Sequence, residues 1–383
     1  MASHTIFITF GTRPEAIKMA PVVLELQRRK VFNVITCLTG QHREMLDQVI
    51  DAFSLPVDHD LKIMRESQTL GHITSAVLNG IDPLLEASKP DLVMVHGDTT
   101  TTFAAALSAF YRMIPVAHVE AGLRTDNIYS PYPEEINRRL ADRLATVYYP
   151  PTSAARETLL REAVAPKNIL VTGNTVIDAL LITAATPTPI WSPDVAAALA
   201  RPGQKVLVTS HRRESWGEPM ERVALAIKRV CEKCPETTFI FPIHLNPVVR
   251  KTFREALGEV SQVVFTEPLP YQPFVHLMKA VDVVITDSGG IQEEAPTLGK
   301  PVLVIRDTTE RPEGIDAGTA RLVGTDVEAI AGQLILLLTD KTEFQKMANA
   351  VNPYGDGRAA VRIADHLEHY FGLRDEPAEE FVL

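Results

Sequence analysis

The amino-acid sequence predicts an α/β protein built from two Rossmann-like, doubly wound domains. Short apolar runs alternate with helical patterns along the chain, and each run is continuously apolar, as expected for strands buried on both faces of a parallel sheet. The alternation stops at residues 186–193 (TPTPIWSP), whose prolines fit neither a helix interior nor a central strand. A chain of 383 residues is long enough for about two domains. We therefore expect one domain over residues 1–175 and another over residues 176–359.

The expected strands form two series, one on each side of the proline-rich segment. The first series comprises residues 5–10, 33–38, 92–95, 116–119, 147–149 and 169–171. The second comprises residues 205–209, 238–242, 263–266, 281–286, 302–305 and 321–323. Ligands of doubly wound folds bind at the carboxyl ends of the strands, so functional residues are expected directly after each strand, facing a cleft between the domains.

Composition and charge narrow the class of protein. Hydrophobic residues make up 45% of the chain and charged residues 22%, which is typical of globular proteins. No apolar run approaches the roughly 20 residues that span a bilayer, and residues 6–10 are too short for the apolar core of a secretory leader. We therefore expect a cytoplasmic protein that does not bind membranes. The net charge of −10 argues against a broad nucleic-acid surface, although a local basic pocket for phosphates remains compatible with it.

The cysteines give no sign of metal or redox chemistry. Cys231 and Cys234 form a CxxC pair at the end of the amphipathic stretch 220–233, with no second pair and no nearby ligand histidines. We interpret both as helix residues and expect no metal site.

The first expected strand leads into Gly11-Thr12-Arg13-Pro14-Glu15. Gly11 permits a tight turn, and Pro14 suits the first turn of a helix. Arg13 and, one turn later, Lys18 are candidates for phosphate contact, although Lys18 also fits a solvated helix lysine.

The second strand ends in Thr39-Gly40-Gln41-His42-Arg43, a polar cluster that is explained equally well as a site or as an ordinary helix start.

Acidic side chains follow the next strands of the first domain. The strand at 92–95 runs into His96-Gly97-Asp98 and four threonines, which are poor helix formers. One threonine can cap the helix, whereas a chemical role is needed to explain Asp98. Glu120 follows the strand at 116–119, and Glu134 follows a few residues later in PEEINR. Paired carboxylates at a cleft can move a proton on and off a carbon.

The second domain contains the clearest anion site, in residues 285–294 (ITDSGGIQEE). Here an apolar strand runs into a glycine turn that opens a helix, so the N–H groups around Gly289 and Gly290 can face a phosphate. Ser288 can cap the helix or donate a hydrogen bond, and Glu294 can accept hydrogen bonds from a ribose. A nucleotide diphosphate fits this pattern. The alternative is an ordinary strand-to-helix turn.

These motifs resemble those of the non-hydrolysing UDP-N-acetylglucosamine 2-epimerases over nearly the whole chain. The resemblance rests on GTRPEAIKMAP, HGDTTTT, HVEAGLRT, PYPEEINRR, VTGNTVIDAL, HRRE, TDSGGIQEEAPTLGKPVLV and RDTTERPE. It implies two Rossmann-like domains in a GT-B-like arrangement, with a C-terminal helix at about residues 360–383 that packs back on the first domain. It also implies a homodimer that serves cell-surface polysaccharide synthesis and needs no cofactor. The acidic residues 375–383 have no counterpart in the resemblance.

The resemblance also assigns roles to individual residues. The catalytic residues would be Asp98, Glu120, Glu134 and His211. The residues that hold UDP would be Arg13, Lys18, Phe274, Ser288, Gly289, Gly290, Glu294 and Arg311.

The chemistry that the resemblance implies is elimination and re-addition. A carboxylate would take the C2 proton while UDP leaves C1, and UDP would add back after C2 is protonated on the other face. The sequence leaves open which carboxylate is base and which is acid, and whether His211 binds phosphate or orients a carboxylate. Three alternatives remain open: a GT-B-type glycosyltransferase that uses a UDP-sugar, a hydrolysing 2-epimerase, and a nucleotide-sugar sensor without turnover.

The resemblance further implies a second UDP-N-acetylglucosamine that binds beside the active site as an activator. Its pocket would use Gln41, His42, Glu134, Arg212 and His244. Ser67 stands where the relatives carry an arginine, so we expect activation to need more ligand.

Overall fold

The computed structural model describes residues 4–40, 43–63 and 68–383, apart from the side chains of residues 43–45 and 214. Contacts divide the chain into two compact units, Met1–Leu181 with Gly355–Leu383 and Ile182–Tyr354. This division assigns the start of helix α7 (Thr175–Ala184) to the first unit, whereas the sequence prediction began the second domain there.

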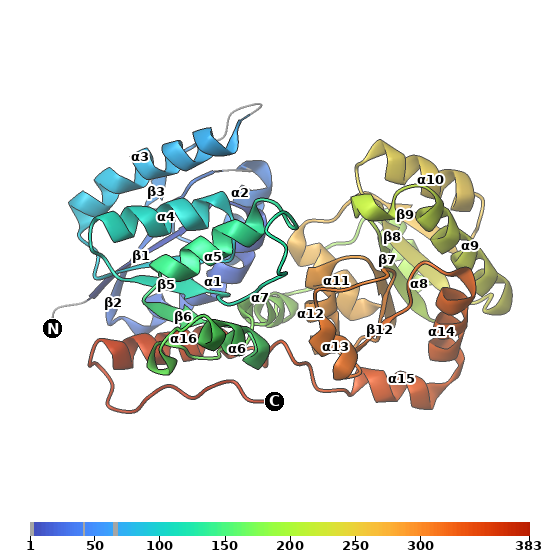
Figure 1. The fold of residues 1–383 in the computed structure, drawn as a ribbon. Helices are drawn as coiled ribbons and strands as arrows, with labels where there is room; N and C mark the ends of the chain where they lie inside the picture. Colours follow the sequence, from blue (N-terminus) through green and yellow to red (C-terminus); the bar gives the residue numbers. More distant parts are fainter. Residues whose placement is uncertain (1–3, 41–42, 64–67) are drawn as a thin grey trace. The chain divides into compact units, whose positions relative to one another are not determined.

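The first unit contains a parallel sheet with the strand order β3-β2-β1-β4-β5-β6 (Figure 1). Its strands are β1 (His4–Phe10), β2 (Phe32–Leu38), β3 (His59–Asp60), β4 (Leu92–His96), β5 (Val116–Val119) and β6 (Val147–Tyr149). The register places Ile6 of β1 opposite Val34 of β2 and Leu92 of β4. Strand order reverses between β1 and β4, so the topological switch point lies between these two strands.

Helices connect the strands of the first unit and cover its sheet. They are α1 (Arg13–Arg29), α2 (Arg43–Phe53), α3 (Leu70–Ser88), α4 (Thr100–Tyr111), α5 (Glu134–Leu144), α6 (Ser153–Arg161), η1 (Pro166–Asn168), α7 and α16 (Ala359–Tyr370). Helix α1 starts with a capping box, in which the Thr12 hydroxyl accepts from Glu15 N–H while the Glu15 carboxylate accepts from Thr12 N–H. Buried Phe7, Val93 and Ile81 belong to the apolar core between the sheet and helices α3 and α4.

The strands of the first unit differ from the prediction at two places. Residues 169–171 are not a strand, because they pair with the sheet through a single bridge from Ile169 to Tyr148. The other side of this segment is taken by the C-terminal tail, whose Phe381 N–H donates to Val171 O at 2.8 Å. The two-residue strand β3 was not predicted, since a histidine and an aspartate give no apolar signal.

The C-terminal helix is shorter than predicted. Helix α16 ends at Tyr370, and Gly372 follows with a φ of +68° that turns the chain out of the helix, so the remaining residues do not continue it to 383. The helix packs on α1, where Arg29 pairs with Asp365 at 2.7 Å and with Glu368 at 3.2 Å. The tail stays on the first unit as well (Figure 1).

The second unit repeats the architecture with the strand order β12-β11-β10-β7-β8-β9. Its strands are β7 (Lys205–Thr209), β8 (Thr238–Pro242), β9 (Val263–Thr266), β10 (Val283–Thr286), β11 (Val302–Val304) and β12 (Ala320–Leu322). Its helices are α8 (Pro193–Ala200), η2 (Arg213–Ser215), α9 (Glu218–Lys233), α10 (Pro247–Leu257), α11 (Tyr271–Ala280), α12 (Gly289–Thr297), α13 (Pro312–Asp316), α14 (Val327–Thr339) and α15 (Lys341–Ala348). The switch point lies between β7 and β10. The prediction of two doubly wound α/β domains is confirmed.

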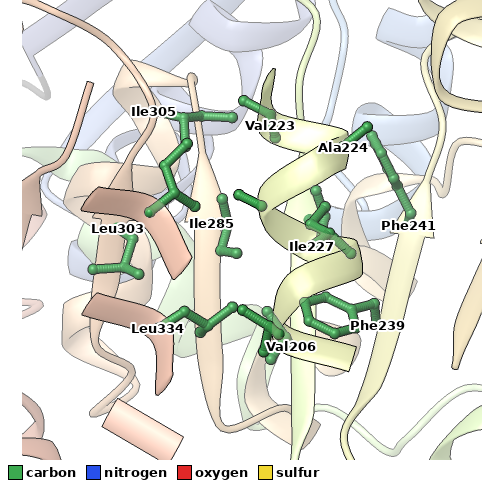
Figure 2. Packing of buried hydrophobic residues seen from close by; sticks show 14 of the residues in the cluster. Val206, Val223, Ala224, Ile227, Phe239, Phe241, Ile285, Leu303, Ile305 and Leu334 are labelled. Atoms are coloured by element: carbon green, nitrogen blue, oxygen red, sulfur yellow. The ribbon is translucent and has the colours of Figure 1, made fainter. Parts of the chain in front are cut away.

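The core of the second unit lies between its sheet and helices α9 and α14 (Figure 2). Figure 2 shows side chains of α9 beside those of the central strands, with the labelled residues Val206, Val223, Ala224, Ile227, Phe239, Phe241, Ile285, Leu303, Ile305 and Leu334. Cys231 belongs to this core, and burial raises the pKa of its thiol to about 11, whereas Cys234 is the C-cap of α9. In the described part of the chain, no helix is both long enough and apolar enough to cross a bilayer.

Candidate active site

The switch point of the first sheet gathers the polar residues that follow β1, β4 and β5. The turn Gly11 to Arg13 follows β1, Asp98 follows β4 after one glycine, and Glu120 follows β5 directly. Parallel strands end at the same edge of the sheet, so these residues lie on one side of the unit.

Glu120 is a buried carboxylate held by a cation and an amide. Its Oε2 accepts a hydrogen bond from Asn174 Nδ2 at 3.0 Å and pairs with Lys18 Nζ, and His96 Nε2 lies 3.7 Å away. Burial by itself raises the pKa of Glu120, but the charges of Lys18 and His96 outweigh burial and hold this pKa well below its usual range. Glu120 is therefore ionised at neutral pH.

Asp98 is more exposed and is paired with Arg138 of α5. Its Oδ2 binds the Arg138 guanidinium, and its backbone carbonyl accepts from Asn137 Nδ2 at 3.0 Å. Arg138 also lies 3.4 Å from the buried carboxylate of Glu135. Helix α5 therefore fixes the position of Asp98, while 27% of the Asp98 side chain remains exposed.

Glu134 is the first residue of α5, the same helix that positions Asp98. Its Oε2 is buried and has no hydrogen-bond partner among the described residues. An unpaired buried carboxyl oxygen costs about 1 to 3 kcal/mol or more, so it is a position that a ligand donor or a proton would satisfy.

Two supporting networks were missed by the sequence reasoning. The first is centred on Glu15, whose buried carboxylate accepts from Gly11 N at 3.0 Å and Thr12 N at 2.8 Å. It also accepts from the hydroxyls of Thr99 at 2.6 Å and Thr102 at 3.2 Å. Glu15 thus ties the turn after β1 to the turn that carries Asp98, and the spacing Thr-x-x-Glu of a capping box was the available signal.

The second network starts at His118, which is fully buried in β5. Its Nδ1 lies 2.6 Å from Asp142 Oδ1, and its Nε2 lies 2.7 Å from Gly97 O. Asp142 also accepts from Arg124 Nη2 at 2.7 Å. Burial raises the pKa of Asp142, but its contacts with His118 and Arg124 outweigh burial and lower it. The network fixes the carbonyl of Gly97 beside Asp98, and no sequence pattern links residues so far apart.

Arg13 and Lys18 differ in what they contact. Arg13 begins α1 and is half-buried, and it has neither a hydrogen bond nor an ion pair among the described residues. Lys18 lies one turn later and pairs with Glu120. Arg13 is therefore available to a phosphate, whereas Lys18 is engaged by a carboxylate of its own unit.

The second unit presents the N-terminus of α12 at its switch point. Ser288 N donates to Thr286 Oγ1 at 2.9 Å, and the Ser288 side chain makes no capping bond. The N–H groups of Gly289 and Gly290 have no hydrogen-bond partner among the described residues. A side chain on Gly289 would approach Arg212 Nη2, which lies 3.8 Å from the position of an added Cβ. Two free amides, the helix dipole and a guanidinium are the groups that an anion would contact here.

His211 is held beside this site by Asp287, a fully buried residue that the sequence reasoning missed. Asp287 Oδ2 accepts from the backbone N–H of His211 at 2.7 Å and of Arg212 at 2.9 Å. Its Oδ1 lies 2.9 Å from His211 Nδ1. Burial raises the pKa of Asp287, but its contact with His211 and these N–H bonds outweigh burial and lower it. His211 Nε2 is left as the ring nitrogen available to a ligand.

His244 lies next to His211, with ring centroids 5.8 Å apart. Its Nδ1 accepts from Asn246 N at 3.2 Å, so the proton of the neutral ring is on Nε2. Burial lowers the pKa of His244, and His211 lowers it further.

The remaining predicted ligand residues lie around α12. Glu294 is buried and accepts from the Tyr271 hydroxyl at 3.0 Å. Arg311 pairs with Glu293, and Phe274 is half-buried on α11, on the same helix as Tyr271. The predicted activator residues Gln41 and His42, together with Ser67, lie outside the described residues.

Two doubly wound units define a two-domain α/β protein of the GT-B-like class. The family model for UDP-N-acetylglucosamine 2-epimerase matches residues 24–368, and the chain belongs to that family.

Named relatives and a solved structure agree over almost the full length. The UDP-N-acetylglucosamine 2-epimerase of Bacillus subtilis is 49% identical over 382 residues, covering 100% of both chains. That of Escherichia coli K12 is 50% identical over 372 residues, covering 95% of this chain and 98% of the other. The crystal structure of the Neisseria meningitidis enzyme bound to UDP-N-acetylglucosamine is 46% identical, covers 95% of this chain and 100% of the other, and has a TM-score of 0.84.

Proposed function

We propose that this chain interconverts UDP-N-acetylglucosamine and UDP-N-acetylmannosamine by inverting C2, without net hydrolysis. Family membership gives the substrate class, since the Neisseria relative binds UDP-N-acetylglucosamine. The observation that carries the proposal is the pair of cation-bound carboxylates, Glu120 and Asp98, at the switch point of the first unit.

The difficulty of the reaction is the C2 proton, which is not next to a carbonyl. Elimination avoids a carbanion because the electron pair of the C2–H bond forms the C1–C2 double bond while the C1–O bond to UDP breaks. The products of this step are a neutral 2-acetamidoglucal, a protonated carboxyl and UDP with one more negative charge. Protonation of C2 on the opposite face and return of UDP to C1 complete the inversion.

The anion site of the second unit is suited to UDP as a leaving group. The free N–H groups of Gly289 and Gly290 and the guanidinium of Arg212 can accept the charge that develops on the diphosphate. Ser288, Arg13 and Arg311 are further candidates for phosphate contact. Glu294 is assigned to the ribose and Phe274 to the uridine.

Proton transfer is assigned to the carboxylates of the first unit. Inversion needs a base for one face of C2 and an acid for the other, and Asp98, Glu120 and Glu134 are the candidates. His211, held by Asp287, is assigned to the departing phosphate, which its Nε2 can contact.

Proton NMR of UDP-N-acetylglucosamine with the protein in D₂O tests this function. Deuterium is expected at C2 of both sugars, and the pool should settle as a mixture of the two UDP-sugars. Conversion without deuterium at C2 would exclude the elimination route. Free N-acetylmannosamine with stoichiometric UDP would identify a hydrolysing enzyme instead, and turnover that needs an added acceptor would identify a glycosyltransferase.

A second UDP-N-acetylglucosamine is proposed as an activator, with Arg212, His244 and Glu134 among its ligands and Gln41 and His42 as further candidates. Progress curves starting from UDP-N-acetylmannosamine alone should show a lag that added UDP-N-acetylglucosamine abolishes, and His244→Ala should remove this response. Linear curves that the addition leaves unchanged would contradict the activator site. The proposed homodimer is checked by light scattering of the purified protein.

A further inference from the structure

The two carboxyl oxygens of Glu120 have different surroundings. Oε2 is contacted from three elements, by Lys18 of α1, by Asn174 before α7 and by His96 at the end of β4. Oε1 has no hydrogen-bond partner among the described residues. Gly97, which has no side chain, lies beside Oε1, and a Cβ added at Gly97 would be 3.9 Å from this oxygen.

This asymmetry has a chemical consequence. Each donor that binds a carboxyl oxygen withdraws its electron density and occupies a lone pair, so the oxygen without donors is the one that can accept a further proton. The Glu120 backbone is also held in the left-handed region, with a φ of +66°, which is uncommon for a residue other than glycine. The backbone and the contacts on Oε2 together fix the direction in which Oε1 points.

His96 is unusual among these contacts. Only 4% of its surface is exposed, and neither ring nitrogen has a hydrogen bond within the part of the chain that is described. Its Nε2 lies 3.7 Å from Glu120 Oε2. Leaving a buried imidazole without a hydrogen bond is unfavourable. An electrostatic role toward Glu120 explains this cost, whereas packing alone does not.

We propose that Lys18, Asn174 and His96 form a clamp on Oε2 of Glu120, and that Oε1 is the atom that takes the C2 proton. In this assignment, which rests on the proposed function, Glu120 is the base of the elimination step. As the C2–H bond breaks, the proton joins Oε1, its electron pair forms the C1–C2 double bond, and UDP leaves with the C1–O pair. Lys18 and His96 are positioning residues that keep Glu120 ionised until the proton arrives.

The clamp gives Lys18 a role different from the diphosphate contact that the resemblance implied. The two roles predict opposite results for Lys18→Met. If Lys18 belongs to the clamp, Lys18→Met should leave UDP affinity unchanged within about twofold. It should lower kcat, since the Glu120 carboxylate is then less ionised and less well oriented. Loss of a diphosphate ligand weakens UDP binding by roughly tenfold or more, because a charge-assisted contact contributes about 1.5 to 3 kcal/mol.

The pH profile of kcat/KM separates a clamp from general structural damage. Among the described residues, the charged or titratable side chains that shift the pKa of Glu120 are Lys18 and His96, while Asn174 is neutral. Because Glu120 must be ionised to accept a proton, removing the Lys18 charge should move the acid limb to higher pH. His96→Gln should move it the same way by less. Lys18→Arg keeps the charge and should leave the limb in place.

The experiment compares these variants with wild type and with Lys167→Met, an exposed lysine of the same unit that serves as the control. UDP affinity is measured by isothermal titration, and the Glu120 carboxyl is followed by ¹³C NMR, assigned through Glu120→Gln. Lys18→Met with unchanged UDP affinity, a fall in kcat of about ten- to a hundredfold and a raised Glu120 pKa supports the clamp. The clamp is contradicted if Lys18→Met weakens UDP binding but changes neither the acid limb of kcat/KM nor the pH at which Glu120 titrates. If wild type shows no epimerisation, the proposed function fails, and the NMR titration still decides whether the clamp exists.

Discussion

At the scale of single residues, the chain buries several carboxylates and satisfies each in a different way. Glu15 is bound by neutral donors, Asp142 by a histidine and an arginine, and Asp287 by backbone N–H groups and a histidine. These three carboxylates are buried, whereas 27% of the Asp98 side chain is exposed. We therefore distinguish carboxylates that fix the positions of turns from carboxylates that a substrate can reach.

This separation leads to a prediction for Asp98 and Glu120. Asp98→Asn and Glu120→Gln keep the shape of each side chain but remove its proton-accepting charge, so turnover should fall by on the order of 10² or more. UDP binding, measured by isothermal titration, should persist because its proposed ligands around α12 are untouched. Loss of UDP binding in Asp98→Asn would contradict the role given to Asp98.

A complementary prediction concerns Glu294. Glu294→Ala removes the proposed ribose acceptor, so UDP affinity should weaken by about ten- to a hundredfold, while kcat at saturating substrate changes less. The matched control is Glu328→Ala, an exposed glutamate of α14 in the same unit. A fall in kcat with unchanged UDP affinity would assign Glu294 to the chemical step instead.

The sequence predicted the candidate site to the extent that its residues follow strands. Asp98, Glu120, Gly289 and Gly290 were found because each comes within a few residues of an apolar run. Asn174, His118 and Asp287 were not, because their roles depend on partners 20 to 80 positions away along the chain, such as Glu120, Asp142 and His211. Pairings of that kind are set by strand order, which periodicity does not give.

At the scale of elements, strands were predicted well where burial makes them continuously apolar. All of the second series was placed to within two residues. Strand β10 pairs with β7 on one side and β11 on the other, and its Ile285 is fully buried. The failures lie at the two opposite edges of the first sheet. At one edge β3 is short, and at the other, beside β6, residues 169–171 are paired on one side by a tail from the other end of the chain.

The contact between α7 and α16 leads to a prediction about pH. Asp178 of α7 accepts from Ala359 N at 3.2 Å and Ala360 N at 2.9 Å, and burial raises its pKa from 3.8 to about 6. The folded state then binds this proton more tightly than the unfolded state, so Asp178 favours folding below about pH 4. That advantage is lost as pH rises through about 6, a change of about 3 kcal/mol in the free energy of unfolding.

Denaturant unfolding of wild type and Asp178→Asn at several pH values checks this prediction. The stability difference between them should change by about 3 kcal/mol between pH 4 and pH 7, in favour of the variant at the higher pH. Asp51→Asn, an exposed aspartate of α2, should track wild type throughout. A constant difference between wild type and Asp178→Asn would contradict the raised pKa.

The C-terminal tail gives a second prediction at this scale. Phe381 is 8% exposed, its ring lies 5.4 Å below the guanidinium of Arg362, and neighbouring Glu380 pairs with Arg156 at 2.7 Å. Phe381→Ala should therefore lower the free energy of unfolding by about 3 kcal/mol. Leu383→Ala, two residues later and 72% exposed, should change it by no more than about 0.5 kcal/mol. Equal effects of the two changes would show that the tail does not stabilise the first unit.

At the scale of the whole molecule, two units of one architecture use their turns in opposite ways. In the first unit, the N–H groups of Gly11 and Thr12 are already bound by the Glu15 carboxylate, so this glycine turn is closed to phosphate. In the second unit, Asp287 binds the N–H groups of His211 and Arg212 instead, and the amides at the start of α12 stay open. The position of one buried carboxylate thus decides which glycine turn keeps its amides open.

Hydrogen exchange with and without UDP tests this division over the whole chain. At a UDP concentration of about 100 times Kd, peptides that cover residues 287–292 should exchange more slowly, since a diphosphate would occupy the Gly289 and Gly290 amides and binding would stabilise their unit by up to about 2.7 kcal/mol. Peptides that cover residues 10–13 should already be protected without UDP, because Glu15 holds those amides, and UDP should add little. In Glu15→Ala the same peptides should lose their protection even with UDP present. New protection of residues 10–13 on adding UDP to wild type, with no change at 287–292, would reverse the assignment of the anion site.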